Sequence, residues 1–437
     1  MTKTTRKSTP KKTTTRRASS KKTTTRKASP KKSTARKTSR SSTRKSSSSK
    51  LTQARLNQIL MVAGVVVVLI LGYFYLVSGN DPLGLFDQVE QKPTVETTLP
   101  EPVGSGGDWW QVTFTDPKNV NDASNLAGSI PEKLIGYIND AQSTIHIASF
   151  EFNLTPVAEV LIAAHKRGVE VQWVTDDEYG IEADEEEDHG QFAMLEKAGI
   201  EIKDDGRAAL MHNKFWIFDG QIVWTGSTNI TTNGNFRNNN NVIVLQSAEV
   251  AKIYEREFQE LWDGQSGPRS PSTVDQQSVM IDGTPVRVLF APEDEVVSQL
   301  VPLIESAKSS IRFMAFSFTH DAMGSAVLAR AEAGVDVKGI FETRSSETEY
   351  SELPVLYCAG VPVRQDGNPG TFHHKVFVID DKIVITGSLN FSNNADESND
   401  ENVVVITNSD IAAQYLKEFE RRWGEAQEPD KADMNCR

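Results

Sequence analysis

The spacing of apolar positions divides the chain into three stretches. Residues 1–50 contain almost no aliphatic or aromatic side chain, whereas residues 59–77 are continuously apolar. Beyond residue 107, short apolar runs alternate with stretches in which apolar positions recur every three or four residues, a pattern typical of strands alternating with helices. In the first part of the region beyond residue 107, we expect a helix over 131–141, a strand over 144–150, a helix over 157–167 and a strand over 169–174. This order predicts an α/β fold built around layered sheets.

The region beyond residue 107 repeats itself. Residues 141–152 recur as residues 307–318, an offset of 166, whereas residues 198–200 match residues 359–361 at an offset of 161. The first copy therefore carries five extra residues, which we place in the acidic run 182–188. The repeat predicts two duplicated, layered α/β domains that are related by a pseudo-twofold axis and share a site at their seam.

The composition shifts predict where these units begin and end. We expect a disordered basic tail over 1–57, a transmembrane signal anchor over 58–78, a linker over 79–107, a first domain over 108–265, a linker over 266–283, a second domain over 284–427 and a C-terminal tail over 428–437.

Charge is distributed very unevenly. Residues 1–55 hold 20 Lys or Arg and no Asp or Glu, so the formal net charge of −12 combines a strongly basic tail with a remainder of −32. A tail of Ser, Thr, Lys and Arg cannot bury enough apolar surface to offset its ordering entropy, and we expect it to be disordered. It would bind anionic lipid headgroups or nucleic acid, or it would only set the membrane topology.

The apolar run 59–77 has the length of a membrane span. Nineteen residues at the helical rise give a helix of about 28 Å, close to the hydrocarbon thickness of a bilayer. Basic residues precede the run, and Asp81, Asp87 and Glu90 follow it. The positive-inside rule therefore predicts a single-pass protein with a cytoplasmic N-terminus and its long acidic part on the extracytoplasmic side.

Each copy of the repeat carries the same polar motif. The motif is a histidine, a lysine two residues later and an aspartate five residues after that, followed by Gly-Ser-x-Asn. Its residues are His212, Lys214, Asp219, Ser227 and Asn229 in the first copy, and His373, Lys375, Asp380, Ser388 and Asn390 in the second. Because each His and Lys are two residues apart on a predicted strand, they share one face.

Two histidines and two lysines around one point suit the cleavage of a phosphodiester. One neutral imidazole would attack phosphorus, the other would protonate the leaving oxygen, and the lysines would balance the phosphate charge. The spacings match no metal-ligand set, and we expect neither a metal nor a cofactor.

Both motifs resemble the HKD signature of the phospholipase D superfamily, over roughly residues 125–427. The resemblance implies a covalent phosphohistidine intermediate at the seam between the halves. It also implies that Ser227, Asn229, Ser388 and Asn390 hold phosphate and that the motif aspartates are mostly structural. The short halves look most similar to the branch of the compact endonuclease and the cardiolipin hydrolase.

The same resemblance points to one further position in each half. Glu401 follows His373 by 28 residues, and the equivalent position after His212 is Asn240. In two-copy relatives, this residue of one half orients the histidine of the other half. By resemblance Glu401 would support His212 as the nucleophile, while His373, as the general acid, would face Asn240 in place of the usual carboxylate.

Other candidate residues have structural interpretations. We expect His146 to be packed in a strand, His320 to lie near the opening of the site and His374 to support it from behind. Cys358 should end a helix in the core, and Cys436 has no evident partner. Two cysteines exclude a disulfide scaffold and a cysteine-rich zinc site.

The leading hypothesis is a membrane-anchored phosphodiesterase that hydrolyses or transfers phospholipid headgroups. The first alternative is a membrane-tethered, metal-independent endonuclease, against which the acidic body argues. The second alternative is not an enzyme: it is a tether, driven by the basic tail, with a disabled phospholipase D-like fold. The oligomeric state stays open.

Overall fold

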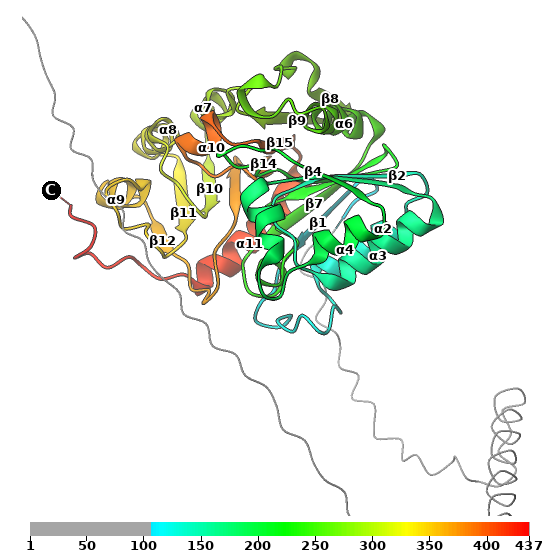
Figure 1. The fold of residues 1–437 in the computed structure, drawn as a ribbon. Coiled ribbons are helices and arrows are strands. Elements are labelled where there is room, and N and C mark those ends of the chain that lie inside the picture. Colours follow the sequence, from blue (N-terminus) through cyan, green and yellow to red (C-terminus); the bar gives the residue numbers. More distant parts are fainter. Residues whose placement is uncertain (1–105, 437) are drawn as a thin grey trace, which may run out of the picture. The chain divides into compact units, whose positions relative to one another are not determined.

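Two mixed β-sheets with their covering helices make up residues 106–436, the part of the chain that this computed structural model describes (Figure 1). The predicted basic tail, signal anchor and nearly all of the first linker lie outside these residues. Within residues 106–436, no helix has both the length and the apolar character needed to cross a membrane.

The two sheets have equivalent strand orders. The first runs β1 (Trp110–Phe114), β7 (Asn241–Gln246), β6 (Ile222–Gly226), β5 (Lys214–Phe218), β2 (Thr144–Ser149), β3 (Glu170–Thr175) and β4 (Glu201–Asp204). The second runs β8 (Ser278–Ile281), β9 (Thr284–Ala291), β15 (Glu401–Thr407), β14 (Ile383–Gly387), β13 (Lys375–Ile379), β10 (Ser310–Ala315), β11 (Asp336–Phe341) and β12 (Val363–Gln365). In each sheet, three parallel strands adjoin an antiparallel set, so the predicted duplication of α/β domains is confirmed.

Helices connect and cover these strands. In the first half they are α2 (Ile130–Asp140), α3 (Thr155–Arg167), α4 (Gln191–Lys197), α5 (Thr232–Phe236) and α6 (Ala248–Trp262). In the second half they are α7 (Val296–Glu305), α8 (Asp321–Glu332), α9 (Glu352–Cys358), α10 (Asn393–Glu397) and α11 (Ser409–Glu425). The four elements expected over residues 131–174 are therefore present as α2, β2, α3 and β3. One difference is that β8 lies within the predicted linker 266–283 and pairs with β9.

The strands that carry the motifs are buried along their whole length. All five residues of β5 and all five of β13 are buried, because each strand lies inside its sheet and both faces of the sheet are covered. A central strand of this kind consists of consecutive apolar residues, as the runs after Lys214 and Lys375 do. The buried strands hold the motif lysines at their first positions.

A shared apolar core joins the halves. Phe215 on β5 and Tyr254 on α6 pack against Phe290 on β9, with ring centroids 6.4 and 5.5 Å away. The same cluster includes residues of α11, such as Tyr415 and Phe419, which are fully buried. Each half therefore completes the core of the other.

The C-terminal segment is attached covalently to the second domain. Cys358, at the end of α9, forms a disulfide with Cys436, with their Cα atoms 5.3 Å apart. The expectations that Cys358 lies in the core and that Cys436 has no partner were wrong: both cysteines are exposed, and the chain returns to α9 because Met434 is buried against the second domain.

The motif aspartates stabilise the fold at the far end of each strand from the histidines. Asp219 accepts hydrogen bonds from the backbone N–H groups of Gln142, Ser143 and Thr144. Asp380 does the same for residues 308–310. Partial burial acts to raise the pKa of both carboxyls, but the hydrogen bonds outweigh it and lower the pKa. Each aspartate thus fixes the turn that leads into the strand beside the motif strand.

We predict that Asp219→Asn lowers the free energy of unfolding by about 1.5–3 kcal/mol, the usual range for hydrogen bonds to a charged group. Asparagine tolerates the left-handed backbone found here, at φ 53°, so the loss reports the charge. Because the folded pKa is lowered, the stabilisation is present above the unfolded pKa and is lost as the pH falls. Denaturant unfolding at pH 7 and pH 3 measures both effects. An unchanged free energy at pH 7, equal to that of the exposed Asp140→Asn control, would contradict this role.

Candidate active site

His212 is held by a carboxylate from the other half of the molecule. Its Nδ1 lies 2.7 Å from Oε2 of Glu401, and both side chains are buried. Ser388 and Asn399 also donate hydrogen bonds to this carboxylate, at 2.6 and 3.1 Å. With the proton on Nδ1 bound to Glu401, Nε2 keeps its lone pair, which is the state required of a nucleophile.

His373 is held by an amide in the equivalent place. Its Nδ1 lies 2.9 Å from Oδ1 of Asn240. Asn240 is itself fixed, because its Nδ2 donates to the carbonyl of Gly234 at 2.7 Å and Ser227 donates to its Oδ1 at 2.8 Å. The amide thus orients the imidazole but brings no negative charge to it.

Backbone hydrogen bonds also link each histidine to the opposite half of the molecule. The N–H of His212 donates to the carbonyl of Asp400 at 2.8 Å, and the N–H of His373 donates to the carbonyl of Asn239 at 2.9 Å. Residues 211 and 400, and residues 239 and 372, form parallel bridges at these points. Both histidines are therefore placed by the edge of the opposite domain.

The lysines take matching positions in the two halves. Nζ of Lys214 donates to the carbonyl of His212, and Nζ of Lys375 donates to the carbonyl of His373, both at 2.9 Å. Each ammonium also lies over an aromatic ring, Phe150 at 5.1 Å and Phe316 at 4.7 Å. Neither phenylalanine was among the expected site residues, although both lie in the repeated segment.

Burial and mutual repulsion shift the protonation of this cluster. Burial, followed by the charges of Lys214 and Lys375, lowers the pKa of both His212 and His373 well below its usual value. Burial also lowers the pKa of Lys214 to about 8 and raises the pKa of Glu401 to about 7. Both imidazoles are therefore neutral near pH 7, and a bound phosphodiester anion would favour protonation of one of them.

The Gly-Ser-x-Asn residues divide into two groups. Ser227 and Ser388 are fully buried, and their hydroxyl protons are donated to Asn240 and Glu401. Asn229 lies at the cavity wall and donates from Nδ2 to Glu151 at 2.9 Å. Oδ1 of Asn390 is buried without a partner among the described residues. The expected binding of phosphate by these four residues stays a prediction.

Two cavities share Phe316 and Thr371 in their linings, and one of them also contains His373. The cavity on the second-domain side has a volume of about 490 Å³ and includes Glu342 and Arg344 in its lining. The cavity on the first-domain side, about 510 Å³, is lined by His373 itself together with Glu151 and other residues. His212 is 5% exposed, whereas His373 is partly exposed, so His373 has the better access to solvent and substrate.

Three further histidines lie around the site rather than in it. His146 bonds Glu255 at 2.6 Å and stacks on Phe258, as expected for a packed residue. His374 is fully buried, with Nδ1 3.2 Å from the amide of Asn241. His320 directly precedes α8, with Nε2 3.9 Å from Asp396, and lines neither cavity.

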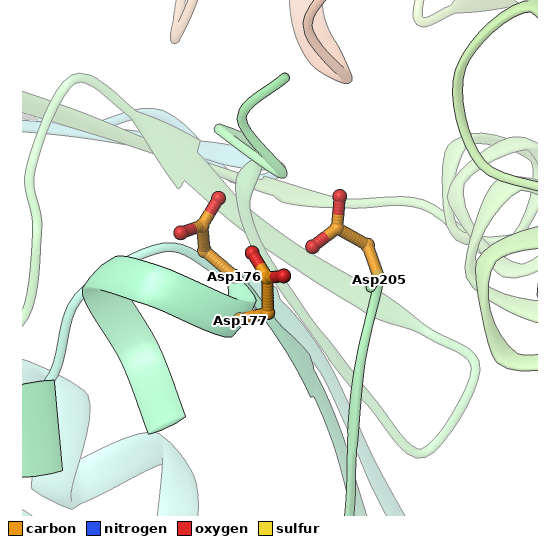
Figure 2. Close-up of side chains that lie close together, drawn as sticks. All are labelled: Asp176, Asp177 and Asp205. Carbon is orange, nitrogen blue, oxygen red and sulfur yellow. The ribbon is translucent and has the colours of Figure 1, made fainter. Parts of the chain in front are cut away.

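Three aspartates lie close together behind His212. Asp176, Asp177 and Asp205 each offer a carboxylate oxygen within 4.8 Å of the others (Figure 2). Asp176 is already engaged, because it accepts hydrogen bonds from the backbone N–H groups of Met211, Tyr179 and Glu178. Burial, followed by the charges of Asp176 and Asp400, raises the pKa of Asp205 to about 7. Among the described residues this trio has the spacing to hold a divalent cation, and Asp176 also fixes the segment before His212 through the N–H group of Met211.

A model of the cardiolipin synthase, phospholipase D-like domain matches residues 134–262 and 300–423. Mouse mitochondrial cardiolipin hydrolase is 35% identical over 129 residues, which are 30% of this chain and 58% of the hydrolase. A phospholipase D of Rickettsia bellii is 34% identical over 134 residues, 31% of this chain and 67% of the relative. The chain thus spans about half to two thirds of the length of these relatives.

A solved structure shares the fold across both halves. The phosphatidylserine synthase of Haemophilus influenzae superposes with a TM-score of 0.55 at 13% identity, covering 72% of this chain and 86% of the synthase. The likeness to the cardiolipin hydrolase branch, expected from the short halves, is confirmed. Because the family model matches both copies of the repeat, the chain belongs to the phospholipase D superfamily and carries two of its domains.

Proposed function

We propose that this protein is a membrane-anchored phosphodiesterase that hydrolyses or transfers phospholipid headgroups through a phosphohistidine intermediate. The observation that carries the proposal is the contact between His212 and Glu401 across the domain seam, opposite the more exposed His373. The names of its relatives, cardiolipin hydrolase and phospholipase D, support a phospholipid as substrate.

In the first step, Nε2 of His212 attacks phosphorus while the bond from phosphorus to the headgroup oxygen breaks. Glu401 stabilises the positive charge that develops on the ring of His212, since its carboxylate accepts the Nδ1 proton. His373, protonated in the presence of the bound phosphate, gives its Nε2 proton to the leaving oxygen. Lys214 and Lys375 balance the charge on the non-bridging oxygens.

In the second step, Nε2 of His373 removes a proton from water, and the resulting oxygen attacks phosphorus as the bond to His212 breaks. An alcohol in place of water would give headgroup transfer by the same route. The neutral Asn240 suits His373 to this exchange, because the ring is oriented without a carboxylate that would hold it in the protonated state.

A phospholipid fits this chain better than nucleic acid. Beyond the basic tail the chain carries a net charge of −32, which repels a polyanion. The predicted anchor over 58–78 would hold the site near lipid and raise the effective substrate concentration. Cleavage of nucleic acid stays the alternative that an assay must exclude.

We also propose that the catalytic domains face an oxidising, extracytoplasmic compartment. The disulfide between Cys358 and Cys436 supports this orientation, since exposed cysteine pairs are kept reduced in most cytosols. The same orientation is expected from the basic residues that precede the apolar run.

We predict that His212→Ala in the full-length protein lowers headgroup release from mixed phospholipid vesicles by at least about a thousandfold. Vesicles, single-stranded DNA and duplex DNA are assayed side by side with chelator present, and His165→Gln on α3 serves as the control. Cleavage of DNA alone would identify a nuclease. Undiminished headgroup release by His212→Ala would refute the assignment of this histidine.

We predict a bell-shaped dependence of kcat/KM on pH, with limbs near 7 and 8. Below about pH 7 Glu401 gains a proton and no longer supports His212, and above about pH 8 Lys214 loses the charge that binds phosphate. Glu401→Gln should remove the acid limb and lower kcat/KM. A profile of Glu401→Gln with the same acid limb as the unaltered protein would assign that limb to another group.

We predict that Cys358 and Cys436 resist alkylation by a membrane-impermeant maleimide in intact cells until a reductant is added. Mass spectrometry of the alkylated peptides measures both thiols, and a variant with both cysteines changed to serine gives the background. Labelling of both thiols in permeabilised cells without reductant would show that the pair is reduced and would contradict the proposed compartment.

A further inference from the structure

The cavity on the first-domain side of His373 is lined by negative charge. Glu151, Glu178 and Glu186 contribute to its wall, and none of the described residues that line it is Lys or Arg. Glu178 and Glu186 are exposed, whereas Glu151 is half-buried and bonded to Asn229. A cavity of this kind attracts a cation and repels phosphate or a second anionic group.

The equivalent cavity on the second-domain side lacks this charge. Its one carboxylate, Glu342, is paired with Arg344 at 2.7 Å. Ser317 occupies the position that Glu151 holds in the first half, 166 residues earlier. The two sides of an otherwise repeated site therefore differ in electrostatic potential. This difference favours one of the two orientations in which a diester could bind across the site.

The acidic insertion of the first half builds part of the charged wall. The five extra residues lie near the run 182–188, and Ala183, Glu186 and His189 all line the cavity. The acidic run in which we placed the extra residues thus lines the cavity that contains His373. Tyr179, 44% exposed, adds an aromatic surface at the same wall, and Phe316 adds another from the second domain.

The direction of the reaction decides which part of the substrate enters this cavity. In an in-line displacement, the leaving group departs on the side opposite His212, where His373 protonates its oxygen. His373 lines the acidic cavity. The leaving alcohol, which is the headgroup, therefore enters the acidic side, and the phosphate stays between the lysines.

Asn229 gives an independent sign of what this cavity binds. It is less than a tenth exposed, and its Nδ2 donates to Glu151, which leaves Oδ1 as an acceptor without a partner among the described residues. Oδ1 of Asn229 and the carboxylate of Glu151 are both hydrogen-bond acceptors, so they would bind a ligand that donates N–H hydrogen bonds.

We propose that the acidic cavity is the headgroup subsite and that it selects headgroups bearing a primary ammonium, held by Glu151, Glu178 and Glu186. Tyr179 and Phe316 add faces on which a cation can rest. The inference rests on the proposed phospholipid hydrolysis and specifies its substrate class. It makes the amino alcohol the product released first and the phosphatidyl group the part retained on His212.

The test compares two short-chain lipids that differ in headgroup charge, dioctanoyl phosphatidylethanolamine and dioctanoyl phosphatidylglycerol, with the full-length protein in detergent micelles. We expect kcat/KM for the ethanolamine lipid to exceed that for the glycerol lipid at least tenfold, as a charged hydrogen bond allows. Glu186→Gln and Glu151→Gln should each reduce this ratio several-fold, and together bring it close to one. Glu186 is exposed, so its substitution leaves the fold intact.

Glu187→Gln is the matched control, because Glu187 is exposed in the same acidic run but does not line the cavity, and it should keep the ratio of the unaltered protein. Hydrolysis of both lipids at equal rates, or an ethanolamine preference that survives Glu186→Gln and Glu151→Gln together, overturns the subsite. Release of neither headgroup, with cleavage of DNA, overturns the proposed function itself.

Discussion

Every part of the candidate active site depends on the docking of the two halves of the molecule. His212 receives both its backbone acceptor and its carboxylate from the second domain, through Asp400 and Glu401. His373 receives the equivalent partners, Asn239 and Asn240, from the first. Burying two lysines and two histidines together is costly. The apolar core shared by the sheets, which includes Phe215 and Phe290, supplies the burial that offsets it.

The electrostatics of the site follow from this arrangement. Because burial, followed by the charges of the lysines, lowers the pKa of both imidazoles, the unliganded site is poised to receive an anion rather than to hold a proton. The carboxylate behind one histidine and the amide behind the other would separate the roles proposed for the two histidines. A nucleophile needs support for a positive ring, whereas an acid that must later act as a base is better served by a neutral partner.

Much of this could be predicted from the sequence because the chain is a duplicate of itself. The repeat predicted two α/β units, and the family resemblance brought Glu401 to His212. The prediction that each histidine lies on the motif strand was wrong, because the strands begin at Lys214 and Lys375. The sequence could not show contacts between residues that are far apart in the chain and come together only in the fold. Cys358 and Cys436 are 78 positions apart, and no local sequence pattern indicates that they form a disulfide. Likewise, nothing near Ser227 or Ser388 indicates that their hydroxyls turn away from the cavity toward Asn240 and Glu401.

The pairing of Glu401 with Asn240 at equivalent positions has a consequence for how such a site can evolve. Two identical subunits that assemble symmetrically must carry the same residue at both places, and any substitution alters both halves of the site together. Joining the copies in one polypeptide removes that restriction. Each histidine can then acquire its own environment, and one wall of the site can gain an insertion while the other keeps its length. Covalent fusion is thus what allows a symmetric fold to become a directional enzyme.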